Sequence, residues 1–257
     1  MDLTDYRNTD REQERVADLM GLLPGNIANT LDIGARDGFL SKLLAERGTR
    51  VTALDLEQPR IDDERIECVV GDVTGLSFPD AYFDLVFCAE VLEHIPTNLL
   101  RKACSELSRT SNRYVLIGVP YKQDIRLGRT TCHVCGKKNP PWGHVNSFDE
   151  NRLRSLFPEC EVVKMSFVGV ADTDTNFVAC LLMDMAGNPY GTYSQAEPCV
   201  HCGAPLKEPT ERSLMQKIFA RAAFYARSVQ APFLKPHPNW VHVLFEKRKL
   251  EQQQRIR

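Results

Sequence analysis

The stretch Leu31-Asp-Ile-Gly-Ala-Arg-Asp-Gly-Phe39 decides the fold that this sequence predicts. An apolar run leads into Gly34, Gly38 follows in the same short segment, and residues 40–48 then carry apolar side chains at helical spacing. Glycines at these positions allow the unusual backbone torsions of a tight turn and the close approach of a ligand. A second apolar run then ends in the acidic residue Asp55. This order of segments predicts a strand, a tight turn, a helix and a second strand.

The spacing Asp32-Ile-Gly34-x-x-x-Gly38 differs from the nucleotide-pyrophosphate pattern G-x-G-x-x-G. It resembles the first motif of class I S-adenosylmethionine (SAM)-dependent methyltransferases, although that family usually has a further glycine where this chain has Arg36. The resemblance implies that Asp32, Gly34, Arg36 and Gly38 line the methionine end of SAM. It also implies that Asp55 binds the ribose hydroxyls. The alternative is an ordinary strand-to-helix turn that binds no ligand.

Later segments agree with the same family. Gly71-Asp72-Val73 follows a third predicted strand, and the resemblance implies that Asp72 and Val73 contact the adenine of SAM. Leu56, directly after the ribose-binding acid, is implied to contact the cofactor as well. The phrase Phe83-Asp-Leu-Val-Phe-Cys-Ala-Glu-Val-Leu-Glu-His-Ile-Pro96 is close to the family's fourth motif, and this similarity implies that Cys88 lies beneath the cofactor on the fourth strand.

Apolar runs and helical patterns along the chain predict an α/β fold with a doubly wound, mostly parallel seven-stranded sheet whose last strand is antiparallel. The predicted strands lie at residues 30–33, 50–55, 65–72, 85–90, 114–119, 161–168 and 240–246. The predicted helices lie at residues 9–23, 40–48, 97–108, 149–157, 176–186 and 211–229. The first helix begins with Thr9 and Glu12, which fit a capping box.

The resemblance defines the predicted domains. Residues 1–169 together with 239–248 are expected to form the SAM-binding methyltransferase domain. Residues 170–238 exceed what a connection between strands needs, so they are expected to form a helical insertion with the second of two cysteine motifs, the first lying at residues 131–136. Residues 249–257 are charged and are expected to form a flexible tail.

The helix at residues 211–229 has one apolar side, formed by Leu214, Ile218, Phe219, Ala222, Tyr225 and Val229. Such a stripe is expected to pack on the helix's own domain. The alternatives are that the helix lies on a membrane surface or covers a lipid-linked acceptor.

Two Cys-x-x-Cys-Gly motifs supply four thiols, Cys132 and Cys135 in the first and Cys199 and Cys202 in the second. Two such pairs provide the ligands of a closed tetrahedral zinc site, which leaves no position for water and is therefore structural. We predict that this zinc joins the loop after the fifth strand to the later insertion. The alternatives are a redox pair, unliganded core thiols, a histidine of either motif in place of one cysteine, and a catalytic zinc.

The segment Glu90-Val-Leu-Glu93-His94 follows the fourth strand, beside the crevice where open α/β sheets bind ligands. On a helical turn these three side chains would face one way and bind a Mg or Mn ion that activates a substrate hydroxyl. The pattern resembles the Glu-x-x-Glu-His metal triad of ubiquinone-biosynthesis O-methyltransferases and of small-RNA 2′-O-methyltransferases, the latter with a further histidine, here His144. The alternatives are a metal-free site with His94 or His144 as general base, and a structural or cofactor-contact role.

The composition of the chain excludes some classes of protein and favours others. The chain has 257 residues, an apolar fraction of 43% and a formal net charge of −2, which supports a sizeable core and gives no strong signal for nucleic acid. No apolar run reaches the ~18 residues of a transmembrane helix, and the acidic N-terminus is unlike a secretory signal. We therefore expect a soluble, cytoplasmic protein with reduced thiols.

These patterns predict a SAM-dependent methyltransferase whose acceptor is a hydroxyl oxygen of a small molecule, sugar or glycan. One alternative is an RNA 2′-O-methyltransferase, which the cysteine motifs and the arginine-containing tail favour and the net acidic charge disfavours. The other is a methyltransferase-like module that binds a partner through its zinc insertion and catalyses no reaction.

Overall fold

The computed structural model describes residues 7–171 and 174–248. The tail predicted for residues 249–257 lies outside the described residues. The chain divides into two compact units. The first, called the sheet unit, contains the chain up to residue 121, residues 148–169 and the chain from residue 238. The second, called the insertion unit, contains residues 122–147 and 170–237.

This division differs from the predicted domains, because residues 122–147 belong with the later insertion rather than with the sheet. Hydrogen bonds join the two segments of the insertion unit. The N–H of Thr192 donates to the carbonyl of Gly128 at 3.0 Å, and the N–H of Thr131 donates to the Tyr193 hydroxyl at 3.0 Å. The insertion is therefore one unit built from two separate segments of the chain.

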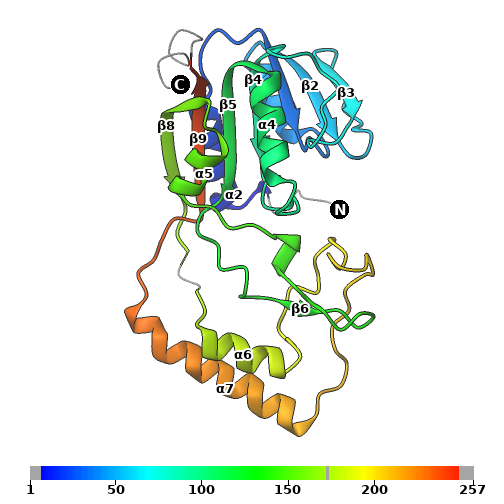
Figure 1. Ribbon diagram of the computed structural model, residues 1–257, viewed down its shortest axis with the longest axis vertical. Helices are drawn as coiled ribbons and strands as arrows, with labels where there is room; N and C mark the ends of the chain where they lie inside the picture. The colour runs from blue at the N-terminus through cyan, green and yellow to red at the C-terminus, as the bar shows by residue number, and fades with distance from the viewer. Residues whose placement is uncertain (1–6, 172–173, 249–257) are drawn as a thin grey trace. The chain divides into compact units, whose positions relative to one another are not determined.

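The sheet unit contains seven strands in the order β3-β2-β1-β4-β5-β9-β8 (Figure 1). They are β1 (Asn29–Ile33), β2 (Arg50–Asp55), β3 (Ile66–Val70), β4 (Phe83–Ala89), β5 (Ser111–Pro120), β8 (Cys160–Val168) and β9 (Trp240–Lys247). β1 pairs in parallel with β2 and β4, whereas β9 is antiparallel to both β5 and β8. The predicted mostly parallel sheet with an antiparallel last strand is confirmed.

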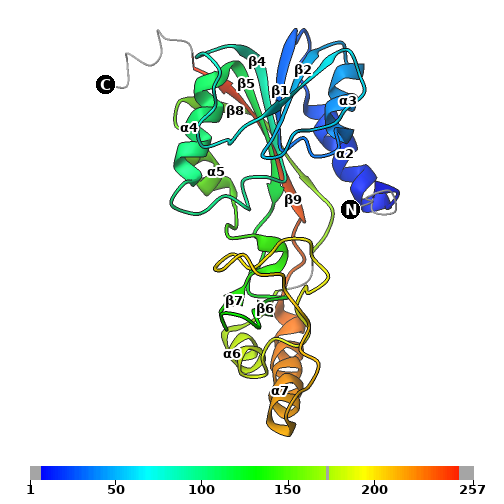
Figure 2. The ribbon, with the colours of Figure 1, turned by 90° about the vertical axis from the view of Figure 1, so that its right-hand side faces the viewer.

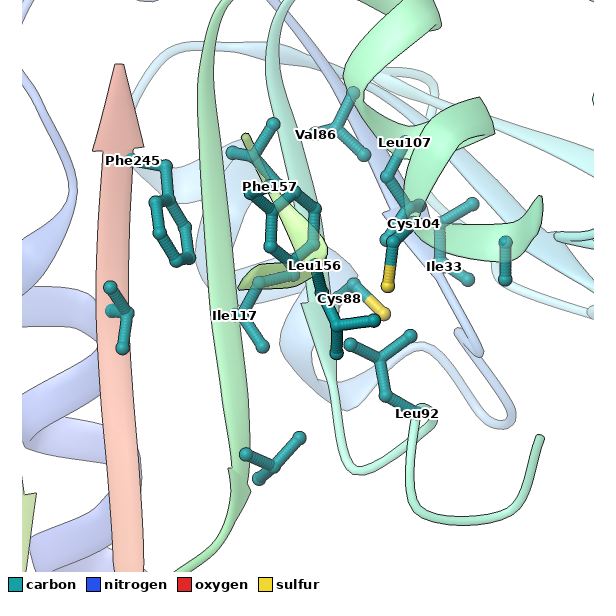
Figure 3. Packing of buried hydrophobic residues seen from close by; sticks show 14 of the residues in the cluster. Ile33, Val86, Cys88, Leu92, Cys104, Leu107, Ile117, Leu156, Phe157 and Phe245 are labelled. Carbon is teal, nitrogen blue, oxygen red and sulfur yellow. The ribbon is translucent and has the colours of Figure 1, made fainter. Parts of the chain in front are cut away.

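Helices cover both faces of this sheet (Figure 2). The cores assign α2 (Asp10–Leu22) and α3 (Phe39–Glu46) to one face, and α4 (Leu100–Thr110) and α5 (Glu150–Leu156) to the other. Alternate residues of β4 belong to the two cores, because successive side chains of a strand point to opposite faces. Figure 3 shows the core on the α4 side. Burial of both faces explains why the central strands are almost continuously apolar.

α2 begins where the sequence predicts. The Thr9 hydroxyl accepts the N–H of Glu12 at 3.3 Å, which is one half of the predicted capping box. The Glu12 carboxylate is bound by Arg15, whose Nη2 and Nε lie 2.6 and 2.8 Å from its two oxygens. Both side chains of this ion pair are buried, so the pair holds a charged group inside the sheet unit.

In the insertion unit, α6 and α7 lie side by side (Figure 1). The elements of this unit are β6 (Thr130–Thr131), β7 (Lys138–Asn139), the 3-10 turn η1 (Pro141–Gly143), α6 (Phe177–Met185), α7 (Leu214–Gln230) and the 3-10 turn η2 (Ala231–Phe233). β6 and β7 form a short antiparallel pair. The helices predicted at residues 176–186 and 211–229 are thus present, the second with a later start.

The expectation that α7 packs through its apolar stripe is wrong. Leu214, Ile218 and Val229 are 75%, 50% and 72% exposed, whereas α7 buries Ala220 and Ala223. Small side chains at a contact let two helices approach closely, so the packed face of α7 is the one without large side chains. Of the helices in the described ranges, none has the length and apolar character that crossing a lipid bilayer requires.

Candidate functional site

The turn between β1 and α3 contains the two motif glycines. Gly34 and Gly38 have φ angles of 77° and 80°, in the left-handed region that glycine adopts without strain. A Cβ added at Gly34 would lie 2.4 Å from a methyl carbon of Val91, and one at Gly38 would lie 2.4 Å from Ile61. Both the backbone torsions and the space around them therefore require glycine.

Arg36 stands where the resembling family usually has a third glycine. Its φ angle of 49° lies in the same left-handed region, so this turn keeps a glycine-like backbone although the residue carries a side chain. The N–H of Arg36 donates to Oδ2 of Asp55 at 2.8 Å, which ties the turn to the end of β2. The replacement of glycine by arginine therefore leaves the shape of the turn in place.

Asp55 ends β2, and its strand pairs in register with β1. Its carboxylate accepts the N–H of Arg36 on Oδ2 and the N–H of Leu56 on Oδ1, at 2.8 and 2.7 Å. These two bonds orient the carboxylate, and each oxygen retains a lone pair for a further donor. The Leu56 side chain itself is exposed.

The other residues predicted to contact the cofactor lie after β3 and on β4. Asp72 is exposed, and its Oδ1 accepts the N–H of Thr74 at 2.7 Å, whereas Val73 is buried in the core. Cys88 is fully buried, and Figure 3 places it among the core residues on the α4 side. Burial raises the pKa of its thiol well above the ordinary range. The Cys88 side chain thus belongs to the core, while its strand reaches the same sheet edge as Asp55.

Asp32 is a buried carboxyl group on β1. The Ser41 hydroxyl donates to its Oδ2 at 2.5 Å. Burial raises the pKa of Asp32 to about 7, with the Ser41 hydrogen bond opposing the shift and the charge of Asp55 adding to it. This group therefore titrates near neutral pH, several units above an exposed aspartate.

We expect Asp32→Asn to remove a pH dependence from the stability of the protein. In the unfolded chain Asp32 titrates near 3.8, so between about pH 4 and pH 7 unfolding releases a proton that the folded state retains. The free energy of unfolding contributed by this group therefore falls as pH rises through that window, in total by a few kcal/mol at about 1.4 kcal/mol per pKa unit. Urea denaturation from about pH 4.5 to pH 8 measures this, and equal pH slopes for variant and wild type would contradict it.

The segment from Glu90 to His94 does not form a helical turn from its first residue. Glu90 has a φ of 57° and lies before the turn of residues 92–94. Its Oε2 accepts the Nε1–H of Trp240 at 3.4 Å, and its Oε1 lies 3.9 Å from Nη1 of Arg15. In the described ranges, Glu90, Glu93 and His94 do not bring three ligand atoms within 4.8 Å of one another. Glu90 is therefore not part of a three-ligand cluster with Glu93 and His94, and cation binding by this segment stays a prediction.

Glu93 is a buried acid. Among the residues that the structure describes, neither of its carboxylate oxygens has a hydrogen-bond partner. Burial, followed by the nearby charge of Glu90, raises the pKa of Glu93 well above its ordinary range. Burial therefore favours the protonated form of this carboxyl group, which can donate a hydrogen bond.

Arg15 and Trp240 are residues of this region that the sequence does not identify. They come from α2 and β9, and the Arg15 guanidinium lies 5.8 Å from the centre of the Trp240 ring. The available signal is that Trp240, one of two tryptophans in the chain, stands at the start of the last strand. A large aromatic side chain at a strand end beside the ligand-binding edge is a candidate for lining that site.

His144, the predicted downstream histidine, belongs to the insertion unit. It is buried, and its Nδ1 lies 2.6 Å from Oε1 of Gln123. Because an amide oxygen only accepts, this contact places a proton on Nδ1. The ring is therefore held in one orientation by its own loop.

The four cysteines of the two motifs converge within the insertion unit. The sulfur of Cys132 lies 3.7 Å from that of Cys202, that of Cys135 lies 3.7 Å from that of Cys199, and all four lie within 4.8 Å of one another. A tetrahedral zinc ion with Zn–S distances of about 2.3 Å separates its sulfur ligands by about 3.8 Å. A disulfide would require about 2.05 Å. The spacing fits a zinc ion and does not fit disulfides between these pairs.

Each of the two cysteine motifs forms a turn of the same kind. The N–H of Gly136 donates to the carbonyl of Cys132 at 2.9 Å, and that of Gly203 to the carbonyl of Cys199 at 2.8 Å. Burial opposes ionisation of Cys199, but hydrogen bonds from the backbone amides of His201 and Cys202 and from the neighbouring thiols together lower the pKa of its thiol to about 6. A thiolate is the form that binds metal. The Nε2 of His201 lies 3.0 Å from a backbone carbonyl, and this ring is not a member of the cluster.

The chain is similar in sequence and in fold to known methyltransferases. Residues 31–113 match the family model described as "Methyltransferase domain". The ubiquinone biosynthesis O-methyltransferase of Idiomarina loihiensis is 34% identical over 88 residues, which are 30% of this chain and 36% of that protein. The match therefore spans little more than a third of the length of the curated relatives.

Two solved structures share the fold over most of the chain. The N-methyltransferase NodS from Bradyrhizobium japonicum, in complex with S-adenosyl-L-homocysteine, has a TM-score of 0.56 at 16% identity and covers 95% of this chain and 91% of its own. The 1,6-didemethyltoxoflavin-N1-methyltransferase of Burkholderia thailandensis, bound to 1,6-didemethyltoxoflavin and S-adenosylhomocysteine, has a TM-score of 0.54 at 16% identity, with coverages of 96% and 84%. The fold is that of class I SAM-dependent methyltransferases, and the matched segment carries the methyltransferase-domain sequence.

Proposed function

We propose that this protein is a SAM-dependent methyltransferase. The observation that carries the proposal is the Asp55 carboxylate, which two backbone amides hold beside the glycine turn at the carboxyl edge of the sheet. Its remaining lone pairs are suited to the two ribose hydroxyls of SAM. Gly34 and Gly38 leave the backbone open for the methionine end, and Asp72 and Val73 follow β3, where the adenine would lie.

Bound SAM supplies an electrophilic methyl group, so the protein has to orient the acceptor and exclude water. We assign the role of general base, which accepts the proton of the acceptor hydroxyl, to His94. Glu93, whose protonated form is favoured by burial, serves as a hydrogen-bond donor rather than as a base. A catalytic divalent cation is not part of the proposal, because Glu90 is engaged by Arg15 and Trp240.

We also propose that Cys132, Cys135, Cys199 and Cys202 bind a structural zinc ion. The support is the separation of their sulfurs and the shared turn of the two motifs. A site closed by four thiolates leaves no position for substrate or water. The zinc would therefore hold the two segments of the insertion unit together and take no part in methyl transfer.

The proposed acceptor is a hydroxyl oxygen of a small molecule, sugar or glycan. The support is that the similar ubiquinone biosynthesis enzyme is an O-methyltransferase. The segment that matches the methyltransferase family model includes β4 and the turn that follows it. An RNA 2′-hydroxyl is the second candidate, which the overall charge of −2 disfavours because phosphate backbones bind cationic surfaces. A non-catalytic binding module is the third.

Methyl transfer from labelled SAM into cell extract tests the proposal. The extract comes from source cells that lack this protein, and it is separated into small-molecule, glycan, nucleic-acid and protein fractions, each incubated with and without a chelator of labile cations. We expect label in the small-molecule or glycan fraction, unaffected by the chelator. Label in the nucleic-acid fraction alone would support the RNA methyltransferase alternative. A folded protein that neither transfers label nor binds SAM would contradict the enzymatic proposal.

A further inference from the structure

A cavity of about 950 Å³ lies within the insertion unit, between α6, α7 and residues 126–129 and 188–191. Six cationic side chains line it, namely Arg126, Arg129, Arg212, Lys217, Arg221 and Arg227. Within the described ranges no aspartate or glutamate lines it. A protein with a net charge of −2 therefore concentrates positive charge at one hollow of its surface.

Two of these cations are neutralised by neighbours. The Nε and Nη2 of Arg126 lie 2.8 Å from the carboxylate oxygens of Asp124, and Arg129 lies 3.5 Å from Asp184. These pairs fix one wall of the cavity. The charges of the opposite wall, on α7 and on Arg212 two residues before it, are left without a carboxylate partner among the described residues.

The remaining four cations have no carboxylate partner among residues 7–171 and 174–248. Arg212 donates to the Tyr190 hydroxyl at 3.2 Å and lies over its ring, and Arg227 donates from Nε to a backbone carbonyl at 3.1 Å. Arg221 lies 6.0 Å from the centre of a tyrosine ring. Arginine forks bind phosphate oxygens with two parallel hydrogen bonds, so this wall is chemically suited to a phosphate group.

The cavity also has an apolar part that reaches solvent. Tyr190, Phe224 and Tyr225 line it, and each is more than half exposed. Met183, Leu127 and three alanines of α6 and α7 also belong to this part of the lining. A ligand of this cavity therefore meets cations and hydrocarbon surface together.

Exposed apolar side chains extend along both helices. On α6 they are Phe177, Val178, Leu181 and Met185, and on α7 they are Leu214, Met215, Ile218, Tyr225 and Val229. The spacing places each set on one side of its helix. Proteins rarely leave such stripes in water, and a basic helix with an apolar stripe is the pattern of helices that lie on membrane surfaces.

We propose that the insertion unit binds an anionic phospholipid surface. Phosphate head groups enter the cavity and bind Arg212, Lys217, Arg221 and Arg227, and the apolar side chains of α6 and α7 insert among the acyl chains. Charge complementarity selects this occupant over a neutral apolar partner, because cations line the cavity and both helices that border it carry exposed apolar side chains. This binding does not depend on the methyltransferase proposal.

Vesicle flotation with the full-length, metal-loaded protein tests this. The probes are vesicles of phosphatidylcholine alone and vesicles containing one third phosphatidylglycerol. We expect binding to the anionic vesicles and little binding to the neutral ones. Replacing Arg212, Arg221 and Arg227 together by glutamine is expected to weaken the binding on the order of 100-fold.

A matched set of arginine substitutions outside the cavity shows whether the position of the arginines or the total charge of the protein determines binding. Arg47, Arg60 and Arg101 of the sheet unit are exposed, and their replacement by glutamine changes the net charge equally but is expected to leave the affinity within about twofold. The combined substitution Leu214→Ser, Ile218→Ser and Val229→Ser is expected to weaken vesicle binding as well. Because these side chains are exposed, the fold should stay intact, and circular dichroism checks this. No vesicle binding by wild type, or equal losses in both arginine variants, overturns the proposal.

A soluble phosphate ligand would give a different result. Inorganic phosphate and glycerol 3-phosphate are titrated into wild type and into the serine variant. If these soluble compounds bind as tightly as vesicles, and the serine variant keeps full vesicle binding, the cavity is a site for free phosphate compounds and the lipid proposal fails.

Discussion

Cys199→Ser is expected to abolish stoichiometric zinc binding and to unfold the insertion unit. The four sulfurs stand at the separation of ligands around one ion, and serine removes one thiolate from this closed set. Apart from the cysteines, hydrogen bonds such as those from Thr192 to Gly128 and from Thr131 to Tyr193 join the two segments, and these are individually weak. Structural zinc contributes roughly 10–16 kcal/mol in small zinc domains, more than most domains have in total stability.

Metal analysis of the purified protein and limited proteolysis measure this effect. We expect one zinc per wild-type chain, close to none in Cys199→Ser, and new cleavage within residues 122–147 and 170–237. Cys180→Ser is the matched control, because Cys180 belongs to the same unit but not to the cluster. It should retain its zinc and its protease resistance. A Cys199→Ser protein that loses turnover while it stays folded would indicate a catalytic zinc instead.

Asp55→Ala is expected to reduce SAM affinity roughly 100-fold, because it removes the carboxylate that we propose to accept charge-assisted hydrogen bonds from the two ribose hydroxyls. The same change removes the acceptor of the Arg36 and Leu56 amides, so the turn loses its anchor to β2. Calorimetric titration with SAM and with S-adenosylhomocysteine measures the loss. Methyl transfer should fall with the affinity.

Two controls make this test specific. Asp55→Asn keeps one acceptor for a backbone amide and is expected to bind SAM with an intermediate affinity. Glu57→Ala changes an exposed acid of the same loop and should leave SAM binding within about twofold. Wild-type affinity in Asp55→Ala would contradict the assigned ribose site. A variant that loses SAM but performs its cellular role unchanged would identify a binding module rather than an enzyme.

The fold is accessible from the sequence because its strongest signals are local. The apolar strands, buried on both faces, stand out as continuous runs, and the glycine turn is specified by torsions that other residues rarely adopt. The cysteine cluster is equally accessible, because a repeated Cys-x-x-Cys-Gly motif encodes its own turn. That the glycine turn binds SAM and that the four cysteines bind zinc remain predictions, which the experiments above test.

The turn after β4 shows what a local pattern misses. Residues 90–94 have helical spacing, but Glu90 adopts a left-handed conformation and meets Trp240, which lies 150 residues along the chain. α7 shows a second limit. Helical periodicity finds its apolar side, yet alanines 220 and 223 form the packed face because they allow close approach to α6. Periodicity identifies the sides of a helix but not which side finds a partner.

The position of β9 has a consequence for synthesis on the ribosome. β8 pairs only with β9 in the sheet, and β9 begins at residue 240, about seventy residues after β8 ends. At ~5–20 residues per second, β8 spends several seconds outside the ribosome before its partner exists. During that interval an unpaired strand edge and the apolar surface meant for β9 face other nascent chains, which is the usual origin of aggregation. The pace at which the insertion unit is translated therefore determines how long the unfinished sheet needs protection by chaperones.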